Sequence, residues 1–285
     1  MSDPDQSNAL TTRAKDYAKL WNLSGARHLA RTPTGLLHCV TCADGTRAVL
    51  KCLTDVGQRA EQSAPAVLRA FNGAGAVRLL RSDKGAHLIE YCDGREVLQL
   101  ENGHQDAIAM PILASVLARL RTHVGTRPAH VTTLAHRCKA IDRARPQLGR
   151  AEAAVFDHAR QLADTLLVDQ KPALLHGDFH HSNVVRATRD DRRCWLALDP
   201  QGLWGDPAYD VANLFGNPLQ RPEIPLSKTR PKQLAGYLSQ KLGLAEPRIL
   251  GWAFVHSCIS AAWSIEDGHD PSFRLAVARH IQSSL

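Results

Sequence analysis

The order of hydrophobic and polar positions divides the chain into a strand-rich first third and a helix-rich remainder. In the first third, short apolar stretches are separated by turn signals, of which Asp44-Gly45 is the strongest hairpin signal. Helical spacing of the apolar residues occurs in two places. The predicted elements are a helix over 8–20, short strands within 24–52, a helix over 56–71, and strands over 77–80 and 86–91.

Helical periodicity dominates after a break at Asp93-Gly94. The pattern predicts an α+β protein in two lobes, with a β-rich N-terminal lobe over residues 1–92 and a mainly helical C-terminal lobe over residues 93–285. The predicted helices of the second lobe cover residues 105–122, 129–144, 151–167, 232–241, 246–265 and 271–283.

One stretch of the second lobe is polar where its neighbours are helical. The apolar run 172–175 leads into a polar loop that begins at His176, and strands are predicted over 184–187 and 194–198 with a charged turn between them. If these strands form a hairpin, Asn183 and Asp199 come together at its open end.

This loop and hairpin carry the candidate chemistry. Phosphoryl transfer needs a carboxylate to orient the attacking hydroxyl and oxygen ligands to hold Mg²⁺ on the phosphates. Asp178 can supply the first, and Asn183 with Asp199 can supply the second. Two alternatives are a set of ordinary surface-loop residues and a metal site built from the nearby histidines, which are His176, His180 and His181.

A lysine and a glutamate in the first lobe extend the same hypothesis. Lys51 stands among apolar neighbours on a predicted strand, and Glu61 lies in the helix predicted over 56–71. A strand lysine can contact ATP phosphates, and a helix glutamate can hold it in place. Neither glycine-rich phosphate motif is present, and the only glycine-bearing turn before Lys51 that could cover phosphates is Thr32–Gly35.

Composition limits the partners and the setting. The 285 residues include 44% hydrophobic ones, and the net charge is +7, but the basic residues are dispersed, so no nucleic-acid partner is expected. No run approaches the roughly 20 apolar residues of a membrane span. The polar N-terminus and seven scattered cysteines favour a cytoplasmic protein with reduced thiols. The pair Cys39 and Cys42 lacks a second pair at zinc-finger spacing.

With these residues in view, the chain resembles the aminoglycoside phosphotransferase family, and more particularly its branch of streptomycin 6-phosphotransferases and hydroxyurea phosphotransferases. The residues that carry the resemblance are 174–183, Leu198-Asp199-Pro200, 205–210 and 260–268. The resemblance implies a protein-kinase-like fold, ATP and Mg²⁺ as cofactors, and a small-molecule hydroxyl compound as acceptor.

The resemblance also implies roles for individual residues. Asp178 would be the catalytic base, Asn183 and Asp199 would hold magnesium, and Lys51 with Glu61 would bind the nucleotide phosphates. The segment 89–92 resembles a kinase hinge, in which the Glu90 carbonyl and the Cys92 amide would meet adenine. Asp206 and Asp210 are expected to be structural.

The acceptor is less sharply indicated. Carboxylates suit a polycationic aminoglycoside, and three follow the helix predicted over 246–265, where the family's acceptor pocket would lie: Glu266, Asp267 and Asp270. A streptomycin-like aminoglycoside is the first hypothesis, although the net charge of +7 would not attract a cation. Another small hydroxyl metabolite, hydroxyurea, and a catalytically silent nucleotide-binding regulator are the alternatives.

Overall fold

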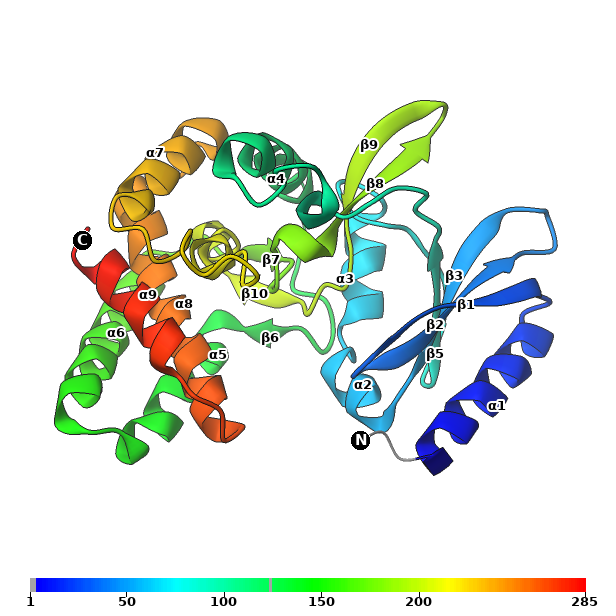
Figure 1. Ribbon diagram of the computed structural model, residues 1–285, viewed down its shortest axis with the longest axis horizontal. Helices are drawn as coiled ribbons and strands as arrows, with labels where there is room; N and C mark the ends of the chain where they lie inside the picture. Colours follow the sequence, from blue (N-terminus) through cyan, green and yellow to red (C-terminus); the bar gives the residue numbers. More distant parts are fainter. Residues whose placement is uncertain (1–3, 123–124) are drawn as a thin grey trace.

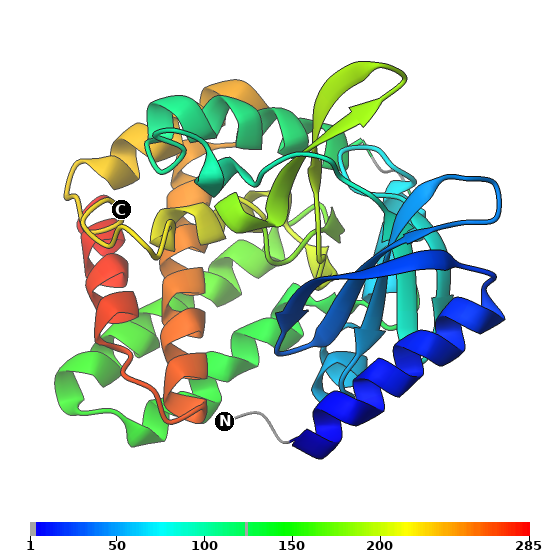
Figure 2. The same ribbon diagram turned by 45° about the vertical axis from the view of Figure 1, so that its right-hand side comes forward.

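The computed structural model describes residues 4–122 and 125–285, which fold into two lobes (Figures 1 and 2). The smaller lobe is built on an antiparallel sheet with the strand order β1-β2-β3-β5-β4. All five strands fall close to the predicted ranges. They are β1 (Ser24–Thr32), β2 (Gly35–Thr41), β3 (Arg47–Leu53), β4 (Leu79–Asp83) and β5 (Ala86–Glu90).

Alternation along β3 gives the two faces of this sheet different neighbours. Ala48 and Leu50 belong to the apolar cluster under helix α1 (Pro4–Leu20), which covers one face. Val49 points to the opposite face and packs into the core that continues into the larger lobe. Since side chains alternate along a strand, Lys51 also lies on that second face, which is the face toward the other lobe.

The helix predicted over 56–71 is interrupted, which corrects the sequence prediction. It divides into α2 (Asp55–Ala60) and α3 (Ala64–Phe71), and Glu61 is the C-cap of α2 instead of a residue inside a helix. Pro65 explains why a second helix begins here, because it stands in the first turn of α3, where its missing N–H costs no helical hydrogen bond.

The larger lobe surrounds one long buried helix. Every residue of α8 from Ile249 to Ala262 is buried, as expected for a helix that is apolar on all sides. Helices α5, α6, α7 and α9 pack around it (Figure 2). The helices of this lobe are α4 (Asp106–Leu120), α5 (Leu134–Ala144), α6 (Arg150–Val168), α7 (Arg230–Leu242), α8 (Glu246–Glu266) and α9 (Ser272–Gln282).

The helix predicted over 129–144 begins later than expected, at residue 134. Thr133 is extended, and its hydroxyl accepts a hydrogen bond from the backbone N–H of His136 at 3.2 Å, so it caps α5. Thr132 and the cap residue itself form a short strand in a three-stranded sheet. Its strands, in spatial order, are β6 (Thr132–Thr133), β10 (Leu203–Gly205) and β7 (Ala173–Leu175).

The predicted catalytic hairpin is present, with longer strands and a tighter turn. Strands β8 (Val184–Arg189) and β9 (Arg192–Ala197) pair antiparallel through a two-residue turn. Asp190 and Asp191 have φ values of 50° and 59°, the left-handed conformation of a type I′ turn. Short 3₁₀ helices complete the described elements: η1 (Val97–Gln99), η2 (Arg145–Gln147), η3 (His181–Asn183), η4 (Pro207–Tyr209) and η5 (Ala212–Gly216).

Three further expectations concern the chain as a whole. The cysteines at all seven positions are free thiols. In the part of the chain that the structure describes, no helix is long and apolar enough to cross a membrane. The predicted boundary between the two lobes, at residues 92 and 93, falls just beyond the end of β5. This boundary remains a prediction based on the order of the elements.

Candidate active site

A buried carboxylate holds the loop that begins at His176. Asp210 accepts hydrogen bonds from the backbone N–H groups of His176 and Gly177, each at 2.8 Å. The His176 ring contacts the carbonyl oxygen of Leu198 through Nε2 at 2.7 Å. These bonds fix the backbone just before Asp178 and join it to the strand that ends before Asp199.

Asp206 has a comparable supporting role. Its carboxylate accepts hydrogen bonds from the Ala208 N–H at 2.9 Å and the Trp252 indole at 2.8 Å, and it pairs with Arg248. Both Asp206 and Asp210 are buried away from the open part of the site. Their surroundings match the structural role expected for them.

The Asp178 side chain is partly open and held on one side. Its Oδ1 accepts a hydrogen bond from the Asn213 amide at 3.0 Å, and its Oδ2 lies 3.9 Å from Nε2 of His180. Burial lowers the pKa of His180, so this ring favours the neutral form. About a third of the Asp178 side chain, 32%, is exposed, which leaves the carboxylate accessible to a hydroxyl group.

The open end of the β8–β9 hairpin brings Asn183 beside the residue that precedes Asp199. The Leu198 N–H donates to the Asn183 carbonyl oxygen at 2.8 Å. The Asn183 amide nitrogen donates to the Asp178 carbonyl oxygen at 2.9 Å, which leaves the side-chain oxygen as an available ligand atom. Asp199 has a φ of 49°, and its side chain is 46% exposed.

Lys51 joins the two lobes. Its Nζ lies 2.8 Å from Oε1 of Glu61 and 2.8 Å from Oδ1 of Asp199, and its side chain is only 3% exposed. Burial by itself would lower the pKa of Lys51, but the two carboxylates outweigh it and raise the pKa. Burial raises the pKa of Glu61, and Asp199 adds to this effect while Lys51 opposes it.

The donor set at this end of the hairpin fits a hard divalent cation. An amide oxygen from Asn183 and a carboxylate oxygen from Asp199 are ligands that Mg²⁺ accepts, and Mg²⁺ commonly completes its shell with water and phosphate oxygens. Among the described residues, no group of three or more His, Cys, Asp or Glu side chains could hold a metal ion by itself.

The proposed hinge has its acidic side chain already engaged. Glu90 accepts hydrogen bonds from Nε and Nη2 of Arg189 on the β8–β9 hairpin, the former at 2.6 Å. Burial would raise the pKa of Glu90, but its hydrogen bonds, chiefly those from Arg189, lower it overall. The side chain of Glu90 is therefore engaged, and its backbone N–H donates to the Arg78 carbonyl oxygen at 2.9 Å, so the hinge expectation concerns the Glu90 carbonyl oxygen alone. Cys92 is partly buried, and burial raises the pKa of its thiol to about 12.

A cavity of about 370 Å³ opens beside Asp178. We call it the acceptor pocket after the role that we propose for it. Asp178 and Asp267 are the carboxylates in its wall, and Trp263 provides an aromatic surface. Glu266 does not line it and instead pairs with Arg143 at 2.7 Å. Asp270 is also outside and accepts hydrogen bonds from the N–H and hydroxyl of Ser272. The three acidic residues grouped by the sequence are thus separated by the fold.

Two basic side chains in the acceptor pocket differ in what they can do. His256 lies between the Tyr209 hydroxyl at 2.9 Å and the Ser260 hydroxyl at 3.3 Å, and burial lowers its pKa to about 3. It is therefore neutral and poorly suited to accept a proton. Burial lowers the pKa of Arg274, which Asp178 opposes, and arginine still keeps its charge. Arg274 makes the pocket less favourable for a cation than its carboxylates alone suggest.

Several residues of this site were not found from the sequence. Asn213 contacts the Asp178 carboxylate, and Arg137 donates to the Gly177 carbonyl oxygen at 2.5 Å. Arg274 and Trp263 line the acceptor pocket. Trp263 lies within the segment 260–268 that carries the family resemblance, but no role was assigned to it from the sequence. The other three belong to no short motif, and all four reach the site from separate elements, so local spacing carried no signal for their roles.

Taken together, the two-lobed fold, the strand lysine and the Asp178 loop define a small-molecule kinase with a protein-kinase-like fold, a phosphotransferase with an alcohol group as acceptor. Residues 20–268 match the model of the aminoglycoside/hydroxyurea antibiotic resistance kinases. The chain belongs to this family, whose kinase chemistry implies ATP as the phosphate donor.

Relatives and solved structures agree with that assignment. The chain is 33% identical to a streptomycin 6-kinase of Streptomyces glaucescens, covering 91% of this chain and 84% of that protein. It is 31% identical to a hydroxyurea phosphotransferase of Kitasatospora aureofaciens, covering 94% and 78%. The crystal structure of aminoglycoside phosphotransferase APH(4)-Ia matches with a TM-score of 0.66 at 16% identity, covering 96% of this chain and 99% of that one, which supports the fold.

Proposed function

We propose that the protein transfers the γ-phosphoryl group of Mg-ATP to a hydroxyl of a streptomycin-like aminoglycoside bound in the acceptor pocket. The observation that carries this proposal is the position of Asp178, whose partly exposed carboxylate lies in the wall of a pocket that also contains Asp267. The names of the relatives, streptomycin kinases among them, support the choice of acceptor.

In the proposed mechanism, Asp178 accepts a hydrogen bond from the acceptor hydroxyl and takes its proton as the oxygen attacks phosphorus. Asn213 keeps the carboxylate in one orientation while this happens. Lys51 would contact the ATP phosphates, with Glu61 holding its ammonium group in position. The backbone at Glu90 and Cys92 would meet the adenine ring.

Asn183 and Asp199 would hold Mg²⁺ through their side-chain oxygens. When bound, the ion supplies positive charge that offsets the negative charge of the phosphates during transfer. Asp267 would face a cationic group of the acceptor, and Trp263 would pack against it, since an indole face attracts guanidinium groups. Glu266 and Asp270, which have other partners, would contribute at most indirectly.

Hydroxyurea is the second candidate acceptor, and one feature favours it. Arg274 brings positive charge into the acceptor pocket beside Asp178, which a neutral acceptor tolerates better than a polycation. The relative named hydroxyurea phosphotransferase is 31% identical to this chain.

The test measures ADP release with Mg-ATP and a panel containing streptomycin, other aminoglycosides, hydroxyurea and simple amino alcohols. Asp178→Asn should lower kcat by about 10² to 10⁴ while ATP still binds. Asp267→Asn should raise KM for a cationic acceptor and leave kcat nearly unchanged. The matched control is Asp270→Asn, which removes a carboxylate outside the pocket and should leave both constants unchanged. Full turnover by Asp178→Asn would contradict the proposed mechanism.

A further inference from the structure

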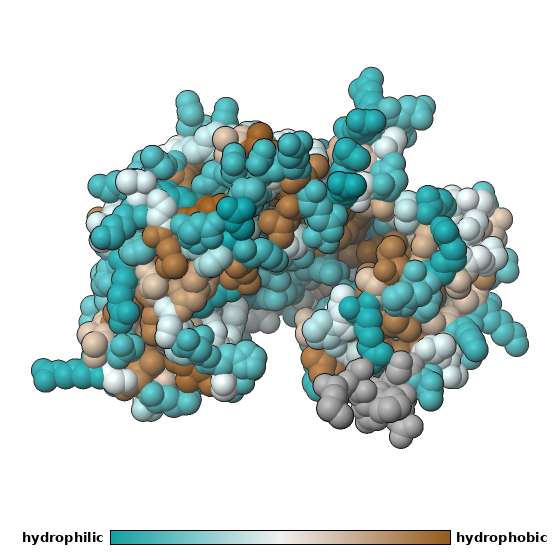
Figure 3. Space-filling view, in the orientation of Figure 1, coloured by the Kyte–Doolittle hydropathy of each residue, from teal (hydrophilic) through white to brown (hydrophobic). Residues whose placement is uncertain are grey.

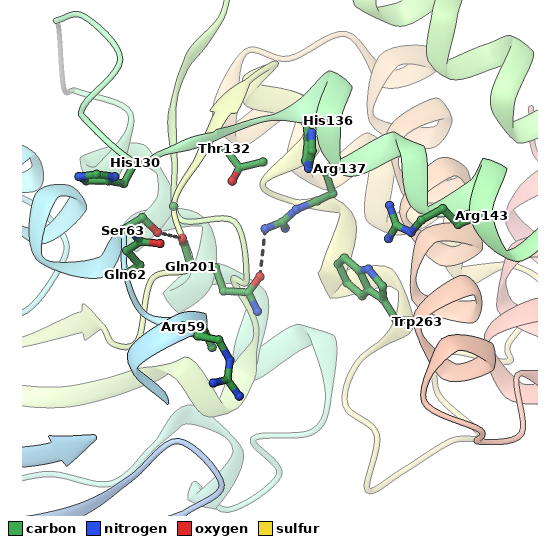
Figure 4. Close-up of a pocket in the computed structure, with 12 residues that line it drawn as sticks. Arg59, Gln62, Ser63, His130, Thr132, His136, Arg137, Arg143, Gln201 and Trp263 are labelled. Carbon is green, nitrogen blue, oxygen red and sulfur yellow. Dashed lines mark hydrogen bonds between the residues drawn. The ribbon is translucent and has the colours of Figure 1, made fainter. Parts of the chain in front are cut away.

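A second cavity lies between the lobes and is lined by arginines; we call it the arginine pocket. It has a volume of about 270 Å³ and shares Gln201 and Trp263 with the acceptor pocket, so the two cavities are neighbours. Figure 4 shows the side chains of Arg59, Arg137 and Arg143 around this hollow. Figure 3 shows the deep notch between the lobes.

The charges around the arginine pocket are unbalanced. Among the residues that the structure describes, no Asp or Glu lines it. Arg143 is paired with Glu266, which lies outside the pocket. The hydrogen-bond partners of Arg137 are neutral oxygens, the Gly177 carbonyl and the Gln201 side chain, the latter at 3.0 Å. Two of the three guanidinium groups thus have no carboxylate partner within the described chain.

Besides Arg137, the guanidinium group without a carboxylate partner is that of Arg59, which stands in the last turn of α2. Its side chain is exposed and makes no hydrogen bond or ion pair with another described residue. It is therefore available to a ligand without the loss of an existing contact. Because α2 belongs to the smaller lobe while α5 carries Arg137 and Arg143, the pocket gathers positive charge from both lobes.

We propose that the arginine pocket binds a small dianion of the phosphate class. Guanidinium groups bind phosphate oxygens through paired N–H bonds, and a phosphate monoester carries a charge close to −2 at neutral pH, which matches the two uncompensated arginines. The dianion joins the lobes at Arg59 and α5, and so supplements the existing hydrogen bond from the Ser63 hydroxyl to the Gln201 carbonyl oxygen.

A dianion of the phosphate class can come from two sources. The proposal holds for either a streptomycin-like acceptor or hydroxyurea. The dianion can be a free phosphate ion, or it can be a phosphate group carried by an acceptor that extends from the acceptor pocket past Trp263. The first source predicts binding without any acceptor. The second predicts a preference among acceptors.

The first arm of the test is calorimetric titration of inorganic phosphate into the full protein at constant ionic strength. A saturating non-hydrolysable ATP analogue with Mg²⁺ keeps the triphosphate site filled. Arg59→Gln should weaken phosphate binding by about tenfold, the effect of losing one charge-assisted bond. Arg143→Gln should weaken it less, because Glu266 already balances the charge of Arg143. The matched control is Arg192→Gln, which removes an exposed arginine from the β8–β9 hairpin, where it lines neither pocket.

The second arm compares pairs of hydroxyl compounds that differ only by a phosphate group, scored by ADP release. A lower KM for the phosphorylated member that disappears in Arg59→Gln supports an acceptor-borne dianion. Phosphate binding that is lost in the same variant supports a free one. The proposal is overturned if phosphate does not bind and no pair shows a preference, or if Arg192→Gln has the same effect as Arg59→Gln.

Discussion

Asn213 offers a direct test of how the fold positions the carboxylate of Asp178, the proposed catalytic base. Its amide donates to Oδ1 of Asp178 at 3.0 Å, and Asn217 in turn donates to the Asn213 side-chain and backbone oxygens at 2.9 and 2.8 Å. Asn213→Ala removes the donor while Asn217 keeps the backbone partner. The change should therefore act on the orientation of Asp178 more than on the fold.

The magnitude follows from the kind of bond. A hydrogen bond to a charged group contributes about 1.5–3 kcal/mol. If this energy is needed in the transition state, its loss lowers kcat by about 10- to 150-fold, since 1.36 kcal/mol corresponds to a factor of ten. KM for ATP should not change, because the side chain of Asn213 contacts Asp178 and Asn217, and neither of these is expected to bind the nucleotide.

The assay is steady-state ADP release with the best acceptor of the panel, together with thermal unfolding to confirm that the variant is folded. A double-mutant cycle isolates the contact. In an Asp178→Asn background, Asn213→Ala should have little further effect on the residual rate. Wild-type kcat in Asn213→Ala, or an equal loss in both backgrounds, would refute the positioning role.

Two further predictions concern stability. A Cβ atom on Gly57 would lie 1.9 Å from the Thr34 carbonyl oxygen, so Gly57→Ala should lower the free energy of unfolding by about 1–3 kcal/mol in a denaturant titration. The control is Gly236→Ala in α7, where the added Cβ would meet no atom closer than 3.7 Å, and this change should be neutral or stabilising in the same titration. Burial lowers the pKa of His181 to about 4, so the unfolded chain binds a proton below about pH 6.5 that the folded chain does not bind until about pH 4. The free energy of unfolding should therefore fall between pH 6.5 and pH 4, and His181→Leu should reduce this slope by up to about 1.4 kcal/mol per pH unit; an unchanged slope would contradict the assignment.

Much of the architecture was predictable because it depends on short-range patterns. Short apolar runs bounded by turn signals predicted the strand that carries Lys51, and apolar periodicity located most of the helices. The spacing of Asn183 and Asp199 around two strands predicted their meeting at the open end of a hairpin, and the observed pairing of β8 with β9 confirms that hairpin. The errors, at Glu61 and at the start of α5, occurred where a proline or a threonine cap begins a helix at a residue that the periodic pattern did not mark.

The sequence by itself therefore determined the order of the elements, the two-lobed fold class and the residue types able to perform phosphoryl transfer. Only the tertiary structure decided which side chains meet, because the deciding contacts join distant parts of the chain: Lys51 and Asp199 are 148 residues apart, and Asn213 and Asp178 are 35 apart. Packing also separated Asp267, which lines the acceptor pocket, from its neighbours Glu266 and Asp270, and brought arginines of both lobes around one cavity. Local periodicity specifies the direction of a side chain within its element, and the contacts between elements specify what that side chain faces.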